Sequence, residues 1–188
     1  MRMPLPSVFG LAFLVSELGL AVFKRAARQG SRVADKGSLR LLWTVIGLSV
    51  FLAYVAARSL PAAKFGPAAV YPELGAAIFL VGLALRWYAI VYLGRFFTVN
   101  VAIASDHRLI DSGPYRFIRH PSYTGALMAF LGLGLTLGNW VSLALLLAPT
   151  LMVFQRRMDV EEGALLQAFG PRYQDYMRRT KRLLPGIY

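Results

Sequence analysis

The sequence contains no cysteine and only two histidines, His107 and His120, among its 188 residues. Without cysteine no disulfide can form, and thiol usage gives no information about the redox compartment. A zinc site is disfavoured, and a histidine-rich iron centre is excluded, because two histidines supply too few ligands. We therefore expect no metal, and any group-transfer chemistry would need an organic cofactor.

Charged residues are also scarce, at 16% of the chain, whereas 57% of the residues are hydrophobic and the mean hydropathy is +0.53. A soluble domain usually carries about a quarter charged residues. The apolar residues form long runs without alternation, which is typical of a chain whose solvent is the bilayer. We predict an all-α, polytopic integral membrane protein, and at this length a single membrane domain over residues 1–188.

The net charge of +12 would suggest nucleic acid as a partner if the protein were soluble. The basic residues instead avoid the apolar runs and gather between them, as the positive-inside rule describes. Nucleic-acid binding would require aromatic residues interleaved with basic ones on a soluble face. We expect membrane lipids as partners and no nucleic acid.

Five apolar segments are predicted to span the membrane: 7–23, 41–57, 74–93, 123–137 and 141–154. Only Gly138, Asn139 and Trp140 separate the last two, which predicts a tight antiparallel hairpin. Residues 1–93 would form an N-terminal part of three transmembrane helices, and residues 94–188 a C-terminal part that contains the hairpin.

The distribution of basic residues predicts the orientation. We count 17 of them in the segments on one side of the membrane and three, Arg2, Arg58 and Lys64, on the other. This asymmetry places the N-terminus outside and the C-terminal tail in the cytoplasm, and five spans agree with ends on opposite sides. Lys24 and Arg25 directly follow the first apolar segment without a small-residue cleavage site, so we interpret it as a retained helix.

Two charged residues, Glu17 and Arg86, lie within predicted spans. A charge inside a span is a functional candidate, because leaving it unpaired in hydrocarbon is costly. The alternative is that both face the interior of the helix bundle, where they pair, or that their side chains reach an interface.

Two polar segments, 107–125 and 156–188, contain both histidines and the only adjacent carboxylate pair, Glu161 and Glu162. The orientation above makes both segments cytoplasmic, so they can meet at the membrane surface. Arg157 and Glu161 are four residues apart on one helix face, a spacing that also suits an ordinary salt bridge.

Pro121 suits the first position of the fourth span. The amides of Ser122, Tyr123 and Thr124 are then expected to be free for an anion such as a cofactor carboxylate, with His120 at the mouth of the site. Aromatic faces for an adenine ring or a sulfonium cation are offered by Tyr115, Phe117 and Tyr123. The alternative is that these aromatic rings form an interfacial belt.

The segments GPYRFIRHPSYTG and RRMDVEEGALLQAFGPRYQDYMRRTKRLLPGI, with a short apolar hairpin between them, resemble the C-terminal signature of the isoprenylcysteine carboxyl methyltransferase family. The resemblance covers about residues 100 to 187. It implies a cytosolic pocket for S-adenosyl-L-methionine under a C-terminal helix, with S-adenosyl-L-homocysteine as product. It also implies an opening to the lipid for an amphiphilic or prenylated acceptor that is methylated on a carboxylate, and it makes residues 94–188 the catalytic core.

Carried over by position, the resemblance assigns cofactor binding to Asn100, His107, Arg108, Leu109, Ile110, Tyr115, His120, Pro121, Ser122, Tyr123 and Glu161. Arg157 matches the acceptor-side arginine of the family. We expect Glu161 to lie one turn deeper in the pocket than Arg157. An acceptor other than a carboxylate would need a base, for which Glu162 and His120 are the candidates.

Two other functions fit the same composition. A membrane NADPH-dependent reductase of the sterol or steroid type has a similar arginine, histidine and tyrosine pattern, and a non-catalytic lipid-binding protein can share the fold. The adjacent glutamates and the FGPRYQDY segment favour the methyltransferase. We expect the protein in a bacterial or archaeal plasma membrane.

The charge asymmetry predicts how introduced cysteines react. Cysteines at Ser112 and Ser31 should be protected from an impermeant thiol reagent added to intact cells, whereas a cysteine at Ala63 should react. The natural chain contains no cysteine, so labelling reports the introduced residue alone. If the first two positions are labelled as fast as the third, the orientation is wrong.

Overall fold

The computed structural model describes residues 4–23, 32–33, 37–66, 70–97, 102–103 and 108–188. Its helices are α1 (Leu5–Phe23), α2 (Gly37–Ser59), α3 (Val70–Leu93), α4 (Pro121–Leu137), α5 (Trp140–Phe169) and α6 (Pro171–Arg179). Short 3₁₀ turns are η1 (Pro61–Ala63), η2 (Gly94–Phe96) and η3 (Gly113–Arg116). The two-residue strands β1 (Arg32–Val33) and β2 (Ala102–Ile103) pair antiparallel. The regular structure of the described residues is otherwise helical, as predicted.

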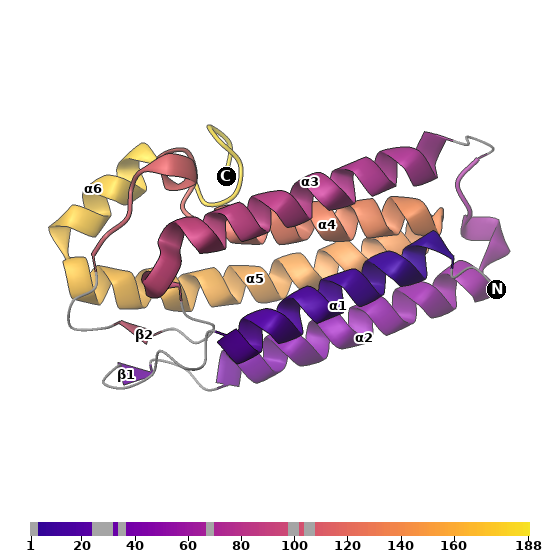
Figure 1. Ribbon diagram of the computed structural model, residues 1–188, viewed down its shortest axis with the longest axis horizontal. Helices are drawn as coiled ribbons and strands as arrows, with labels where there is room; N and C mark the ends of the chain where they lie inside the picture. The colour runs from indigo at the N-terminus through magenta and orange to yellow at the C-terminus, as the bar shows by residue number, and fades with distance from the viewer. Residues whose placement is uncertain (1–3, 24–31, 34–36, 67–69, 98–101, 104–107) are drawn as a thin grey trace.

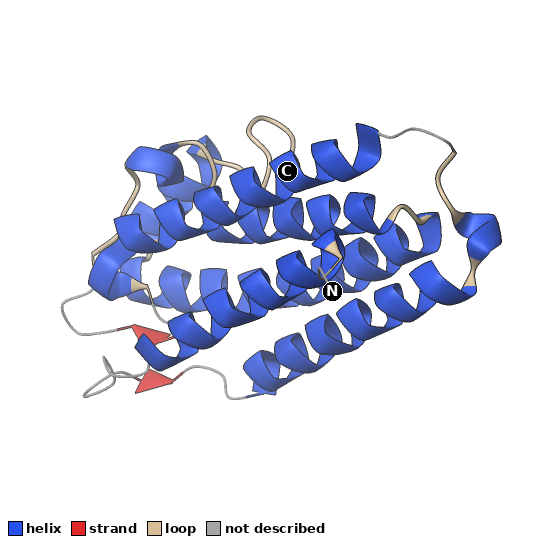
Figure 2. Ribbon diagram, turned by 45° about the vertical axis from the view of Figure 1, so that its right-hand side comes forward, coloured by secondary structure: helices blue, strands red, loops and turns tan. Residues whose placement is uncertain are grey.

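Helices α1 to α5 lie side by side along the long axis of the molecule, and α6 and the strand pair lie together at one end (Figures 1 and 2). A core of phenylalanine and aliphatic side chains fills the space between the long helices and includes Phe79, Phe130, Leu133 and Leu146. Successive long helices are antiparallel. This arrangement brings the C-terminal end of α3, the start of α4 and the second half of α5 to the same end as α6.

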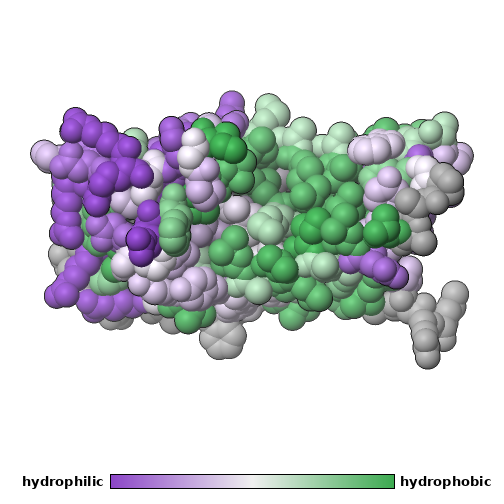
Figure 3. Space-filling model, turned by 90° about the horizontal axis from the view of Figure 1, so that it is seen from above, coloured by the Kyte–Doolittle hydropathy of each residue, from purple (hydrophilic) through white to green (hydrophobic). Residues whose placement is uncertain are grey.

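Hydrophobic side chains dominate the middle of the molecule, and hydrophilic ones gather at the α6 end (Figure 3). Among the described residues, three helical segments are long and apolar enough to cross a membrane: Leu39–Ser59, Val70–Phe96 and Trp140–Phe169. The segments Leu5–Leu20 and Pro121–Leu137 are apolar but shorter. Each predicted span is thus a helix in a membrane-type fold, whereas the number of five crossings and their orientation stay predictions.

The hairpin between α4 and α5 is confirmed. Gly138 follows α4 with a φ of 65°, a left-handed conformation that favours glycine, and Asn139 caps α5 by accepting a hydrogen bond from the amide of Ser142 at 3.0 Å. From Trp140 the helix runs 30 residues without a break. That is about 45 Å against about 30 Å of hydrocarbon, so α5 is long enough to cross the bilayer and still carry Arg157 and Glu161 at its polar end.

Glycines bring the backbones of α3 and α4 into direct contact. A Cβ on Gly82 would lie 2.6 Å from the backbone nitrogen of Ala129, and one on Gly125 would lie 2.5 Å from that of Arg86. Small residues allow this close approach in membrane helices, where van der Waals contact drives helix association. The contact fixes Arg86 of α3 beside the first turn of α4.

Candidate functional site

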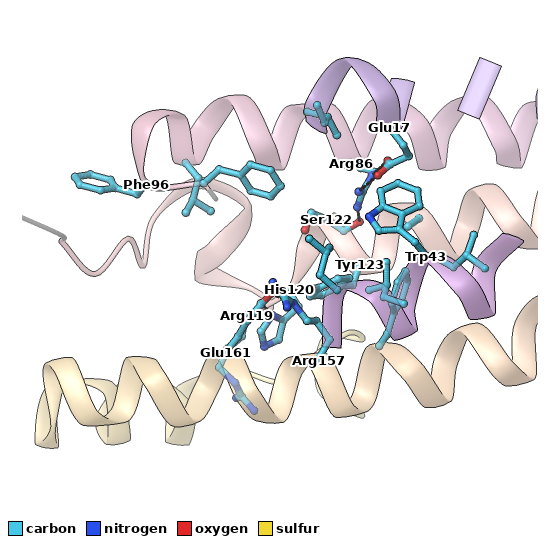
Figure 4. Close-up of a pocket in the computed structure, with 18 of the residues that line it drawn as sticks. Glu17, Trp43, Arg86, Phe96, Arg119, His120, Ser122, Tyr123, Arg157 and Glu161 are labelled. Atoms are coloured by element: carbon cyan, nitrogen blue, oxygen red, sulfur yellow. Dashed lines mark hydrogen bonds and ion pairs between the residues drawn. The ribbon is translucent and has the colours of Figure 1, made fainter. Parts of the chain in front are cut away.

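A cavity of about 180 Å³ lies between the five long helices at the level where α4 begins. We call it the central cavity. Its polar lining consists of Glu17, Arg86, Tyr115, Arg119, His120, Ser122, Tyr123, Arg157 and Glu161. Its apolar lining includes Phe13, Leu42, Trp43, Ile46 and Phe154. Figure 4 shows Glu17 and Arg86 on one side, Arg157 and Glu161 on the other, and Ser122 and Tyr123 between them.

The start of α4 places three predicted cofactor residues, His120, Ser122 and Tyr123, in the wall of the central cavity. Pro121 is the first residue of α4, as predicted, and His120 precedes it as the N-cap. The amides of Tyr123 and Thr124 donate to the carbonyl of His120, at 3.0 and 3.1 Å. The prediction that these two amides are free for an anion is therefore wrong, because the first turn closes on the carbonyl of its own cap.

Tyr123, Arg157 and Glu161 form one polar cluster. The Tyr123 hydroxyl donates to Glu161 Oε1 at 2.5 Å, and Arg157 Nε donates to the same oxygen at 3.2 Å. The predicted pairing of Arg157 with Glu161 along one helix face is confirmed. The order of depth is not: the side chain of Arg157 is 2% exposed and that of Glu161 25%. Residue 157 precedes residue 161 on a helix that leaves the apolar region, so Arg157 is the deeper of the two.

Glu162 lies beside this cluster but faces away from the central cavity. Its Oε1 accepts from Arg119 Nε at 2.8 Å and lies 3.0 Å from His120 Nε2. Its Oε2 accepts from Arg182 Nη2 at 2.7 Å and from Nε at 3.1 Å. Both oxygens of this buried carboxylate are thus engaged, and Glu162 does not line the cavity. A general base must reach the substrate proton, and this geometry gives Glu162 no such access.

The chain after α6 folds back onto the segment before α4. The amide of Arg119 donates to the carbonyl of Lys181 at 2.8 Å, and that of His120 to the carbonyl of Arg182 at 3.0 Å. Arg119 Nη1 also donates to the carbonyls of Met177, at 3.2 Å, and Thr180. The position of His120 is therefore set by backbone pairing with the tail as well as by Glu162.

Arg119 and Arg182 were not predicted as site residues, because the sequence marked them only as basic residues of the loops. The one signal available in the sequence was composition. These two arginines and His120 need acidic partners, and the chain has a single adjacent glutamate pair. Spacing along a helix predicts neighbours on that helix. It does not predict that residue 182 turns back to residue 162.

The other predicted cofactor residues fall into three groups. Tyr115 lines the central cavity and donates to the carbonyl of Ala89 at 3.2 Å, and burial raises the pKa of its phenol, which keeps it neutral. Arg108, Leu109, Ile110 and Pro121 do not line the cavity: Arg108 is exposed, and Leu109 packs on Tyr173 and Tyr176. Asn100 and His107 lie outside the described residues.

The two intramembrane charges are brought together, as one of the alternatives predicted. Arg86 Nε and Nη2 donate to the two oxygens of Glu17 at 2.5 and 2.7 Å. The pair closes the side of the central cavity opposite Arg157 (Figure 4). Within the described part of the chain, no three His, Cys, Asp or Glu side chains gather as a metal ion requires, and the expectation of a metal-free site stays a prediction.

Fold and site together define a helical membrane protein with a cavity lined by both charged and apolar side chains. Residues 75–167 match the model of the isoprenylcysteine carboxyl methyltransferase (ICMT) family. The chain belongs to this family of membrane methyltransferases. The matched region contains most of α3, most of the α4–α5 hairpin and the glutamate pair.

Individual relatives agree. The chain is 34% identical over 120 residues to the protein-S-isoprenylcysteine O-methyltransferase of Schizosaccharomyces pombe, covering 63% of this chain and 51% of that one. It is 32% identical over 131 residues to the "Probable protein-S-isoprenylcysteine O-methyltransferase" of Oryza sativa subsp. indica, covering 64% and 69%. A solved structure of the eukaryotic intramembrane Ras methyltransferase ICMT is similar with a TM-score of 0.63 and 30% identity, over 77% of this chain and 52% of that one. The chain thus spans about half the length of the yeast relative and of the solved protein.

The Glu162 contacts predict a large loss of stability when its charge is removed. Glu162→Gln should lower the free energy of unfolding by about 3 kcal/mol, because the guanidinium of Arg119, whose side chain is only 9% exposed, loses its counter-charge. Asp159→Asn is the matched control: Asp159 contacts the same Arg182 at 2.8 Å, but its side chain is 60% exposed. This control should stay within about 1 kcal/mol of the natural chain. Denaturation in mixed micelles measures both, and equal losses would contradict the structural role of Glu162.

Proposed function

We propose that the protein transfers a methyl group from S-adenosyl-L-methionine to the carboxylate of an amphiphilic, isoprenylcysteine-type acceptor. The observation that carries this proposal is the cavity itself. It places a buried arginine, Arg157, in one cavity with apolar side chains of α1 and α2, while Tyr123 and Glu161 stand at its polar side. Membership of the methyltransferase family supports the same reaction.

The donor set of the polar side suits the cofactor. The carboxylate of Glu161 accepts from Tyr123 and Arg157, and its 25% exposure leaves it accessible to hydroxyl or amino groups of a ligand. The rings of His120 and Tyr123 lie 5.6 Å apart and those of Tyr123 and Phe154 4.7 Å, which provides aromatic surface for an adenine or a sulfonium. We assign cofactor binding to His120, Ser122, Tyr123, Glu161 and Tyr115. Asn100 and His107 are retained from the family resemblance.

The methyl group would be supplied by the sulfonium of the bound cofactor. A carboxylate acceptor is already ionised, so this chain need only orient it and exclude water. Arg157 would hold such a carboxylate by a two-pronged contact of its guanidinium, which is buried next to the apolar lining. Glu162 then acts as a positioning residue for Arg119 and His120 rather than as a base.

The membrane arrangement completes the proposal. Five spans with the N-terminus outside place the α6 end and the cofactor side of the central cavity in the cytoplasm. Residues 94–188 then form the catalytic core and residues 1–93 the three N-terminal spans of one domain. The acceptor would come from the lipid phase. We propose a bacterial or archaeal plasma membrane as its location, and the relatives named are eukaryotic.

A lipid-extract assay tests this function directly. Purified protein, radiolabelled methyl donor and total membrane lipid should yield a labelled product, and identification of that product by mass spectrometry gives the acceptor. Lability of the label to mild alkali identifies a carboxyl methyl ester. An alkali-stable product would show that the acceptor atom is not a carboxylate oxygen.

Cofactor binding is tested by single substitutions. His120→Ala and Glu161→Ala should each weaken methyl-donor binding by about 1–3 kcal/mol, the cost of a lost buried hydrogen bond. Asp175→Ala serves as the control, because the side chain of Asp175 is 66% exposed on α6. Calorimetry with the folded variants measures the affinity, and unchanged binding in both test variants would reject the site.

Arg157→Lys separates an acceptor clamp from a structural partner. Lysine keeps the charge and a salt bridge with Glu161 but loses the planar two-pronged geometry. Turnover should fall at least about tenfold, a barrier change of about 1.4 kcal/mol, while donor affinity stays within about a factor of three. Near-normal turnover would make Arg157 a partner of Glu161 only, and lost donor binding would place it at the cofactor.

A further inference from the structure

The Glu17–Arg86 pair lies in the wall of the central cavity, on the side away from Glu161 (Figure 4). Arg86 Nε and Nη2 donate to Glu17, and Nη1 donates to the carbonyl of Ser122 at 3.2 Å. Each guanidinium nitrogen therefore has an acceptor. A guanidinium engaged in this way is suited to hold neighbouring elements together rather than to bind a second anion.

The pair links three helices. Glu17 belongs to α1, Arg86 to α3, and Ser122 to the first turn of α4, the turn that also carries Tyr123. The glycine contact between α3 and α4 fixes Arg86 against that turn, since a Cβ on Gly125 would lie 2.5 Å from the backbone nitrogen of Arg86. Glu17 thereby attaches α1 to a rigid unit that includes the cofactor side of the cavity.

Helix α1 has other attachments, but they differ in kind. Phe9 stacks on Phe79 with ring centroids 4.4 Å apart, and Trp87 Nε1 donates to Ser16 Oγ at 2.8 Å. The Ser16–Trp87 bond joins the same two helices as the ion pair, because Ser16 precedes Glu17 on α1 and Trp87 follows Arg86 on α3. Neither Ser16 nor Trp87 lines the central cavity. The chain thus contains two adjacent α1–α3 bonds, one in the cavity wall and one outside it.

Helix α1 provides the apolar wall beside the ion pair. Phe13 and Leu20, one turn before and one turn after Glu17, line the cavity with Glu17 itself. Leu42, Trp43 and Ile46 of α2 continue this wall. A lipid-like chain entering the apolar part of the cavity would lie against these side chains, whereas the cofactor residues are on the other side.

We infer that Glu17 and Arg86 are positioning residues for the acceptor: their ion pair holds α1 in place as the wall against which the apolar chain of the acceptor packs. This inference rests on the proposed methyl transfer. Because the two charges neutralise each other, the wall stays compatible with an apolar chain, and the acceptor carboxylate is directed to Arg157. Loss of the pair should therefore affect the acceptor and not the methyl donor.

The test compares Glu17→Gln with Ser16→Ala in the full-length protein, using S-alkylated cysteines with short and long chains as acceptors. Glu17→Gln should raise the acceptor KM about tenfold for long chains and much less for short ones, with kcat and donor affinity within about a factor of three. Ser16→Ala should leave every constant within about a factor of two, because its bond lies outside the cavity. Arg86→Lys, which keeps the charge but loses the two-pronged contact, is the second variant should Glu17→Gln not fold, and it should show the same dependence on chain length.

If Ser16→Ala raised the acceptor KM as much as Glu17→Gln, the ion pair would serve only to stabilise the packing of α1 on α3, and the inference would be overturned. An effect of Glu17→Gln that is independent of chain length, or a change in donor affinity alone, would also overturn it. Failure of the proposed function is recognised separately: the natural chain would then bind no methyl donor, or would methylate no acceptor from the lipid extract.

Discussion

The buried carboxylate of Glu162 joins three parts of the chain that are far apart in the sequence. It belongs to α5, and it binds Arg119 and His120 from the segment before α4 and Arg182 from the tail after α6. A buried carboxylate is tolerated only when its oxygens are hydrogen-bonded to charged partners. The need to satisfy this one charge therefore brings the tail back over the bundle and holds His120 at the edge of the central cavity.

The second buried ion pair has the corresponding role on the opposite side. Glu17 and Arg86 connect α1 to α3, and Arg86 reaches the carbonyl of Ser122 because glycines let α3 and α4 touch. The first turn of α4 is thus held between the contacts of Glu162 on one side and the Glu17–Arg86 pair on the other. Its side chains enter a cavity that combines the polar cluster of Tyr123, Arg157 and Glu161 with apolar side chains of α1 and α2. This combination matches a reaction between a polar cofactor and a lipid-like acceptor.

The sequence predicted those features that depend on neighbours along the chain. Long apolar runs gave each helix of the bundle, Gly138 and Asn139 gave the hairpin, and the four-residue spacing gave the contact of Arg157 with Glu161. It did not predict features that depend on the direction of a helix relative to the cavity. For this reason the predicted order of depth of Arg157 and Glu161 was wrong. The contacts of Arg119 and Arg182 with Glu162 were not predicted either, because they depend on the path of the C-terminal tail.

The central cavity is proposed to bind S-adenosyl-L-methionine, and the methyl-transfer function depends on this binding. The most direct measurement is calorimetric titration of the purified natural chain in micelles, with S-adenosyl-L-methionine in one experiment and NADPH in another. We expect saturable binding of the methyl donor at one site per chain, competition by S-adenosyl-L-homocysteine, and no binding of NADPH. Binding of NADPH without binding of the methyl donor would contradict the account and favour a membrane reductase, and binding of neither would favour a non-catalytic lipid-binding protein.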